Sequence, residues 1–226
     1  MRRQFLAGVL ALSAIVMTGC SKPAAPPKPE TPAEPPKPKV KAPTLEDTGL
    51  PAPPDSVRVS ILTDKGEIVV ELDGKHAPTT TANFLHYVDE HKLDGGTFYR
   101  AMKSGDSAGF IQGTAAGFTY PPIPHESTKQ TGLSHVNGTI STARYAVGTA
   151  SNEWTICVGD MSYMDAGRDP SGDNQGFAAF GHVVKGMDVV KKILHGRISN
   201  KKAAPGEWQG QTLATPVKII TAKRVS

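Results

Sequence analysis

From residue 55 onward, apolar and polar residues alternate in short runs. One run covers residues 57–61 and a second covers residues 68–72, with the turn sequence Asp64-Lys65-Gly66 between them. Alternation on both sides of a glycine-containing turn predicts a β-hairpin. Further strand-like runs lie near residues 97–102, 109–114, 138–143, 152–158, 178–184 and 217–221.

Two segments follow a helical period instead. Pro78 opens a predicted helix whose Phe84, Leu85 and Val88 share one face, and a second helix over about residues 186–195 collects its apolar residues on one side. About eight strands and two helices predict a mainly β fold, a closed eight-stranded antiparallel barrel capped by the helices. We assign this folded domain to residues 55–226.

The N-terminal residues show neither the alternation of a strand nor the periodicity of an amphipathic helix. Two arginines precede an apolar run from Phe5 to Met17, which is shorter than the roughly 20 residues that span a bilayer but suits the core of a signal peptide. The next residues, Thr18-Gly19-Cys20, complete a sequence that resembles the lipobox of bacterial lipoproteins, where the chain is cut before the cysteine and the cysteine is acylated. The resemblance implies a signal peptide over residues 1–19 and a lipid anchor at Cys20. The alternative is an ordinary secretory signal with an incidental cysteine.

A proline-rich stretch separates Cys20 from the folded domain. Residues 21–54 contain 12 of the chain's 19 prolines, interleaved with Ala, Lys and Glu. Such a composition buries little apolar surface and predicts an extended tether over residues 20–54, with a reach on the order of 100 Å. An SH3-type ligand is the alternative. We expect a lipid-anchored protein of the bacterial cell envelope, facing the periplasm if there are two membranes. Ser21 is not the aspartate associated with inner-membrane retention, which favours the outer membrane.

Charge and cysteine content narrow the functional classes. The formal net charge is +4, and loss of Arg2 and Arg3 with the leader leaves about +2, too little to indicate a nucleic-acid partner. With only Cys20 and Cys157, no disulfide framework supports the fold. The seven histidines lack the paired spacing of a zinc site, so we expect no metal.

Two local motifs suggest other chemistry but lack the right context. Residues 105–109 match the G-x-S-x-G nucleophile elbow, which needs a following helix, whereas strand-like residues follow here. An inserted loop is the better interpretation. Asp165, Asp169 and Asp173 do not have the spacing of a calcium-binding EF-hand loop, and a solvated turn accounts for them better.

The run from Thr97 to Gly113, TFYRAMKSGDSAGFIQG, resembles the cyclophilin stretch in which Phe-His-Arg leads into Gly-Phe-Met-Ile-Gln-Gly. Blocks at residues 123–135, 138–144 and 180–190 agree with that family in order and rough spacing. The resemblance covers residues 57–224. It implies a cyclophilin-like barrel and peptidyl-prolyl cis-trans isomerase activity.

By this resemblance Arg100 is the catalytic arginine. The X–Pro bond rotates slowly because its amide has partial double-bond character. In the twisted transition state the prolyl nitrogen gains a lone pair, which a fixed guanidinium binds more strongly than it binds the planar ground state. Such a mechanism needs no nucleophile, metal or cofactor, and we expect no cofactor. The alternative is a surface arginine on a strand.

The resemblance also implies a substrate groove, in which several positions depart from the family. Glu153 stands where a glutamine is usual, Thr155 where a phenylalanine is usual, Tyr163 where many members have tryptophan, and Phe177 where histidine or tyrosine is usual. Alternation in this strand places Glu153 and Thr155 on the groove side and Trp154 on the other. The implied substrate-binding residues are Phe98, Phe110, Gln112, Thr142, Ala143, Glu153, Thr155, Tyr163, Met164 and Phe177.

Two functions remain open at this stage. The first is an envelope isomerase that assists folding of secreted or envelope proteins and acts on proline-containing unfolded or extended polypeptides. The second is a membrane-tethered module that binds proline-containing peptides with little or no turnover, an alternative favoured by Glu153 and Thr155. For either function we expect a monomer.

Overall fold

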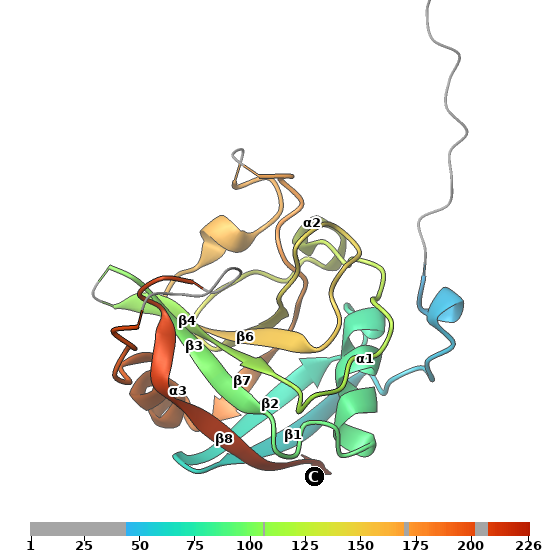
Figure 1. The fold of residues 1–226 in the computed structure, drawn as a ribbon. Coiled ribbons are helices and arrows are strands. Elements are labelled where there is room, and N and C mark those ends of the chain that lie inside the picture. The colour runs from blue at the N-terminus through green and yellow to red at the C-terminus, as the bar shows by residue number, and fades with distance from the viewer. Residues whose placement is uncertain (1–43, 106, 170–171, 202–207) are drawn as a thin grey trace, which may run out of the picture. The chain divides into compact units, whose positions relative to one another are not determined.

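The computed structural model describes residues 44–226 apart from residues 106, 170–171 and 202–207. The predicted signal peptide, Cys20 and most of the predicted tether lie outside the described residues. Eight antiparallel strands close a barrel in the order β1-β2-β7-β5-β6-β4-β3-β8, which confirms the predicted fold class (Figure 1). The strands are β1 Ser56–Thr63, β2 Gly66–Asp73, β3 Thr97–Ser104, β4 Ala108–Thr114, β5 Thr139–Thr142, β6 Glu153–Val158, β7 Ala179–Lys185 and β8 Thr212–Val225.

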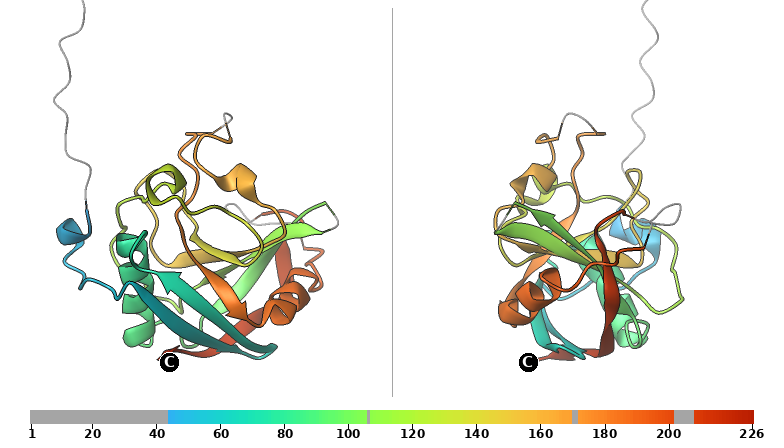
Figure 2. Two further views of the ribbon diagram at one scale, coloured as in Figure 1. Left: turned by 180° about the vertical axis from the view of Figure 1, so that it is seen from behind. Right: turned by 60° about the vertical axis from the view of Figure 1, so that its left-hand side comes forward.

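Two longer helices pack on the barrel, as the periodicity predicts. α1 (Pro78–Asp89) and α3 (Met187–Leu194) lie on opposite sides of it in both Figure 1 and the reverse view of Figure 2. Pro78 is at the first turn of α1, where its fixed φ favours the helix and its missing N–H is not needed. Three further short elements are α2 (Thr128–Thr131) and the 3-10 turns η1 (Leu45–Thr48) and η2 (Ser162–Met164).

The barrel interior is built by strand alternation. In the β1–β2 hairpin the inward residues Val59, Ile61 and Val70 are wholly buried. On β6, Trp154 lies inside, and Phe84 of α1 meets its ring edge-on at a centroid distance of 5.3 Å. Helix and barrel thus share one apolar core, which is the largest source of stability in such a fold.

A β-bulge interrupts this alternation on β3. Phe98 pairs with Gly113 and Arg100 pairs with Gln112, so Tyr99 has no partner on β4. Both Phe98 and Ala101 belong to the barrel core, although they are three residues apart. Because the bulge adds one residue, Arg100 is directed to the side of the sheet away from the core, as bulges near functional sites often do.

Residues 44–54, which the composition assigns to the tether, contain ordered structure. Thr44 caps η1 in a capping box with Asp47, and the segment Pro51–Pro53 lines a small cavity of about 110 Å³ against α1. Just after the end of this segment, Lys75 donates its backbone N–H to the carbonyl of Asp55. Among the described residues, no helix is long and apolar enough to cross a membrane.

Candidate active site

Arg100 lies at the centre of a polar network on the outer side of β3 and β4. Its side chain is only 8% exposed. Its Nε and Nη2 donate to the side-chain oxygen of Gln211 at 2.8 and 2.6 Å, and its Nη1 donates to Oε1 of Gln112 at 2.8 Å. The guanidinium carbon also lies 4.1 Å from the ring centroid of Trp208 and 5.0 Å from that of Phe110. The guanidinium is therefore held in one orientation by three hydrogen bonds and two aromatic rings.

Glu153 extends the network by one further step. Its Oε2 accepts hydrogen bonds from Nε2 of Gln112 at 2.5 Å and from the hydroxyl of Tyr99 at 3.0 Å. The carboxylate thereby fixes which end of the Gln112 amide faces Arg100, because an amide that donates to Glu153 presents its oxygen to the guanidinium. Glu153 thus acts on Arg100 through Gln112.

Burial determines the electrostatics of these groups. It lowers the pKa of Arg100, while Tyr99, Tyr163 and Glu153 act in the opposite sense. An arginine remains protonated in a protein despite such a shift. Burial, together with Glu153, raises the pKa of Tyr99, so its hydroxyl stays a donor at neutral pH.

An apolar cluster lies beside Arg100 and outside the barrel core. It contains the buried residues Phe110, Cys157, Met161 and Met164, with Met102, Ala108 and Phe177 partly buried against them. Burial raises the pKa of the Cys157 thiol to about 12, so this residue behaves as a small apolar side chain and not as a nucleophile. Charged and apolar surfaces therefore meet at Phe110.

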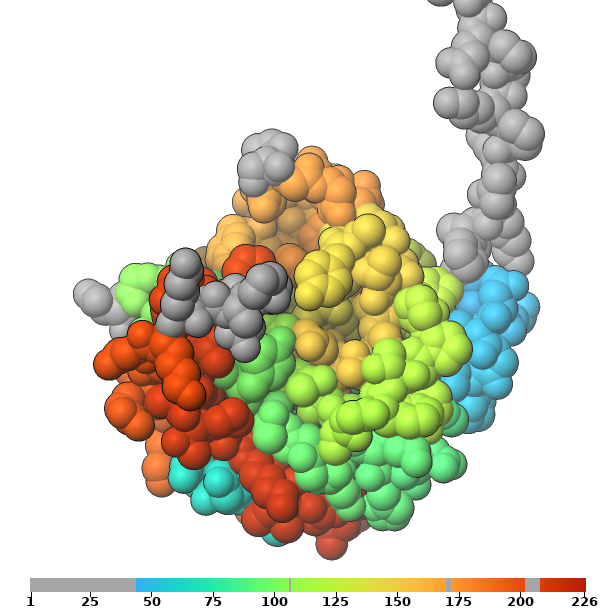
Figure 3. Space-filling view, viewed as in Figure 1, coloured from blue at the N-terminus to red at the C-terminus, as the bar shows by residue number. Residues whose placement is uncertain are grey.

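Arg144 packs against this cluster at Phe177. Its guanidinium lies 5.2 Å from the Phe177 ring centroid and donates to both carboxylate oxygens of Asp173 at 2.6 and 2.8 Å. The pairing holds the pKa of Asp173 at about 2. Figure 3 shows a hollow in the surface between the segment near residue 150 and the segment that follows residue 160.

Most of the residues expected from the resemblance come together here. Gln112 and Glu153 join the Arg100 network, while Phe110, Met164 and Phe177 form the apolar cluster. Thr155 pairs with Gln112 across β4 and β6 and is buried, and Tyr163 is 46% exposed and acts electrostatically on Arg100.

Three expected residues have different surroundings. Phe98 is wholly buried in the barrel core, so its assignment as a substrate-binding residue needs correction: the bulge at Tyr99 separates its side from that of Arg100. Thr142 is 4% exposed and its hydroxyl, among the described residues, has no hydrogen-bond partner. Ala143 is half-buried and donates its backbone N–H to the carbonyl of Glu153 at 3.0 Å.

Sequence reasoning missed Gln211 and Trp208. Both precede β8, more than 100 residues from Arg100 in sequence, within a polar, glycine-containing stretch that carries no catalytic motif. The sequence offers one indirect indication, which is Trp208 itself. A tryptophan in a polar stretch either packs against an apolar or cationic partner or stays exposed.

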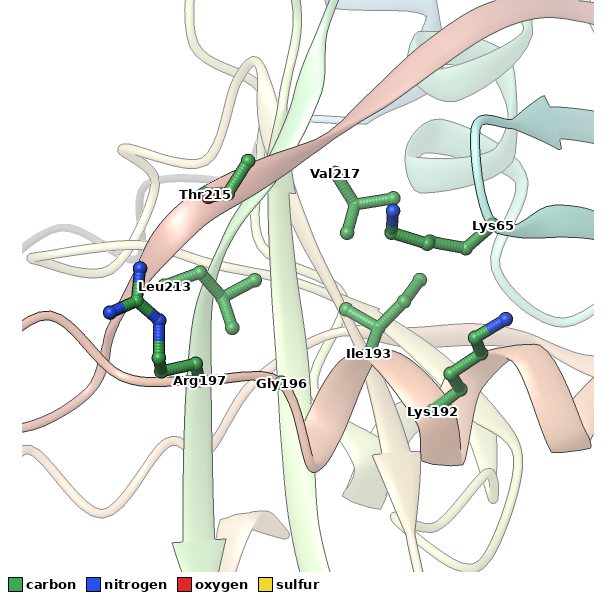
Figure 4. Close-up of a pocket in the computed structure, with 8 residues that line it drawn as sticks. All are labelled: Lys65, Lys192, Ile193, Gly196, Arg197, Leu213, Thr215 and Val217. Carbon is green, nitrogen blue, oxygen red and sulfur yellow. The ribbon is translucent and has the colours of Figure 1, made fainter.

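A separate cavity of about 240 Å³ lies between α3, the β1–β2 turn and the first half of β8. Figure 4 shows Lys65, Lys192 and Arg197 around its aliphatic floor of Ile193, Leu213 and Val217. Within the part of the chain that the structure describes, no group of three or more His, Cys, Asp or Glu side chains is arranged to hold a metal ion.

Comparisons with known proteins agree with this geometry. The family model of cyclophilin type peptidyl-prolyl cis-trans isomerases matches residues 58–223. Peptidyl-prolyl cis-trans isomerase A of Dickeya dadantii is 33% identical over 171 residues, which are 74% of this chain and 84% of that protein. A peptidyl-prolyl cis-trans isomerase of Acinetobacter baylyi is 31% identical over 168 residues, which are 73% of this chain and 84% of that protein.

Solved structures resemble the chain in fold. A Cryptosporidium parvum cyclophilin type peptidyl-prolyl cis-trans isomerase has a TM-score of 0.60 at 15% identity, covering 76% of this chain and 98% of its own. Another structure of that protein, in the presence of the dipeptide Ala-Pro, has a TM-score of 0.58, again at 15% identity, and covers 75% of this chain and 99% of its own. The match of the family model over most of the chain, supported by relatives above 30% identity, shows that the chain belongs to the cyclophilin-type peptidyl-prolyl cis-trans isomerases.

Proposed function

We propose that this isomerase acts on X–Pro bonds of secreted or envelope proteins and that Arg100 is its catalytic residue. The observation that carries the proposal is a protonated, almost fully buried guanidinium held by Gln211 and Gln112 beside an apolar cluster. A donor fixed in this way needs little reorganisation when charge develops on the substrate.

The chemistry follows from how the X–Pro bond rotates. Rotation is opposed by a barrier of about 18–20 kcal/mol, because the planar amide delocalises the nitrogen lone pair. At the twisted geometry the lone pair returns to the prolyl nitrogen, and an N–H of Arg100 donates to it. Because this hydrogen bond is stronger at the twisted geometry than at the planar one, it lowers the barrier. No bond to the substrate is made or broken.

The apolar cluster supplies orientation. A proline ring placed among Phe110, Met164 and Phe177 would bring its nitrogen close to the guanidinium, because Phe110 is 5.0 Å from the guanidinium carbon of Arg100. The dipeptide Ala-Pro used with the Cryptosporidium parvum relative is consistent with a proline-peptide ligand. The proposed partners are therefore proline-containing segments of unfolded or extended polypeptides, bound by a monomer.

A competing function is a module that binds proline-containing peptides without turning them over. The observation that favours it concerns Thr155, at a position where the family usually has phenylalanine. Thr155 is smaller and only 3% exposed, so it adds little apolar surface to the pocket. Exchange NMR on a Phe-Pro-containing peptide separates the two. Exchange between cis and trans peaks faster than in the peptide alone supports the enzyme, whereas peptide binding with unchanged exchange supports the module.

We also propose that the domain is attached to the envelope by a lipid on Cys20, with the residues after it as a spacer. The support is the lipobox-like sequence before Cys20 and the proline-rich stretch after it. The full-length protein should partition into detergent, and Cys20→Ala should be soluble or remain uncleaved. Membrane attachment that is unchanged in Cys20→Ala would place the anchor elsewhere.

A further inference from the structure

The segment Trp208–Gln211, here termed the clamp, reaches Arg100 from the start of β8. Its backbone is fixed next to β3: the carbonyl of Gln211 accepts from the N–H of Ala101 at 2.8 Å, and Thr212 pairs with Arg100. The N–H of Gln211 donates to the carbonyl of Trp208 at 3.1 Å, which closes a four-residue turn. Gly210, third in this turn, has a φ of 74°, a conformation that favours glycine. The clamp is therefore held in place by the same sheet that carries Arg100.

The clamp occupies two of the hydrogen-bond donors of Arg100. A guanidinium has five N–H donors. Gln211 accepts from Nε and from one hydrogen of Nη2, and Gln112 accepts from one hydrogen of Nη1. The two remaining donors are one on each terminal nitrogen, and among the described residues neither takes part in these three bonds. Gln211 thereby fixes the edge formed by Nε and Nη2, and the donors that these bonds do not use are the ones a substrate would meet.

Trp208 adds a different surface to the same place. Its ring centroid is 4.1 Å from the guanidinium carbon of Arg100, yet the side chain is 50% exposed. An aromatic ring that stacks on a cation with half of its area in water presents an apolar wall next to the catalytic group. In contrast, Trp154, the chain's other tryptophan, is 2% exposed and belongs to the barrel core.

We propose that the clamp is part of the active site: Gln211 is a positioning residue for Arg100, and Trp208 is a specificity-determining residue that favours substrates with an aliphatic or aromatic side chain next to the proline. The proposal rests on the proposed role of Arg100. A purely structural clamp would stabilise the fold without affecting turnover or substrate choice.

The test of Gln211 is a double-mutant cycle on the full chain. Gln211→Leu should lower kcat by about tenfold to a hundredfold, the usual effect of losing hydrogen bonds to a charged group, with KM little changed. In the Arg100→Ala background the same substitution should have almost no further effect, because Gln211 acts through Arg100. Thr215→Ala, at an exposed residue of β8 close to Gln211 in sequence, is the matched control and should behave as wild type.

A spectroscopic measurement keeps the test independent of activity. The Nε–H signal of Arg100 in a ¹⁵N spectrum should be sharp in wild type, broadened in Gln211→Leu, and retained in Gln211→Glu, which keeps an acceptor. Wild-type kcat in Gln211→Leu, or an unchanged Nε–H signal, would overturn the positioning role. Inactive wild type with a sharp Nε–H signal would instead contradict the proposed function and leave the clamp geometry intact.

The test of Trp208 is substrate choice. Peptides Ala-Xaa-Pro-Ala and Ala-Ala-Pro-Xaa, with Xaa as Phe, Leu, Ala or Glu, should show a preference for Phe and Leu at one of the two positions. Trp208→Ala should reduce the Phe-to-Glu ratio of kcat/KM by about twofold to tenfold. Phe118→Ala, which removes another partly exposed ring that contacts a cation (Lys92), should leave the ratio unchanged. An unchanged ratio in Trp208→Ala would overturn this role.

Discussion

The barrel interior and the Arg100 site are both largely buried, but they are assembled by opposite means. The interior repeats a simple rule: every second residue of a strand points inward, and one face of each helix covers the barrel. The site depends on exceptions to that rule, since a bulge at Tyr99 redirects Arg100 and a distant turn supplies Gln211. Regular packing builds the barrel, and local departures from regular structure position the side chains of the site.

The two regions also differ in what their side chains contribute. Interior residues contribute apolar area and shape, so a substitution there should change the free energy of unfolding and leave turnover by folded molecules intact. Around Arg100 the contributions are directed hydrogen bonds, so a substitution should change turnover more than stability. Stability and turnover of the folded protein can therefore be measured separately for each substitution.

The largest effect on stability is expected at Phe180. This side chain is wholly buried in the barrel core, and its ring lies 5.5 Å from that of Phe84. Phe180→Ala should lower the free energy of unfolding by about 3–5 kcal/mol, measured by denaturant titration. Turnover per folded molecule should stay within about twofold of wild type. A loss of stability below about 1 kcal/mol would mean that this part of the core is loosely packed.

Acidification should also affect the scaffold. His135 is wholly buried; its Nδ1 lies 2.6 Å from Asp165 and its Nε2 lies 2.8 Å from Ser141. Burial lowers the pKa of His135 from its ordinary value of 6.5, with Asp165 acting in the opposite sense. The unfolded chain therefore binds a proton that the folded chain does not. Stability should fall as the pH drops below about 6.5, by at most about 1.4 kcal/mol per pH unit.

The measurement is a series of denaturant titrations between pH 7.5 and 5. His135→Gln, which cannot titrate, should have a smaller slope of stability against pH than wild type over this range. Equal slopes in the two proteins would show that other groups cause the acid sensitivity. Turnover should vary little from this cause, since Arg100 stays protonated throughout.

Glu153 should give the smallest effect. Glu153→Gln keeps a side-chain oxygen that can accept from Gln112 and Tyr99, so the orientation of Gln112 is preserved, while removal of the negative charge strengthens the field of Arg100 at the prolyl nitrogen. We expect kcat/KM to stay the same or rise by up to about tenfold. A variant that folds normally but is tenfold slower would make the carboxylate charge itself a working part of the site.

The sequence predicts most of the scaffold for a physical reason. Alternation and helical periodicity are local properties, and they locate the β1–β2 hairpin, α1, α3 and the inward direction of Trp154. Proline content is also local, but it is a weaker guide: it assigns residues 44–54 to the tether, although the capping of η1 and the packing of Pro51–Pro53 give that segment structure.

The site is predictable only in part, because its key features are not local. The resemblance of short sequence blocks to one family identifies Arg100, Gln112 and Glu153. The bulge is a property of strand pairing that no apolar pattern encodes, so the sequence does not show that Phe98 and Arg100 lie on opposite sides of the sheet. The contacts of Gln211 and Trp208 with Arg100 arise only when the barrel closes and β8 lies beside β3.

The central claim is that the Arg100 guanidinium, and not the barrel as such, accelerates X–Pro isomerisation. The most direct test is kcat/KM of Arg100→Ala on a proline peptide, with Lys103→Ala, an exposed residue on the same strand, as the control. Loss of a preorganised donor to developing charge commonly costs about 10²–10³-fold, so we predict a fall of that size for Arg100→Ala and wild-type values for Lys103→Ala. A folded Arg100→Ala protein that keeps more than about half of the wild-type kcat/KM would contradict the account.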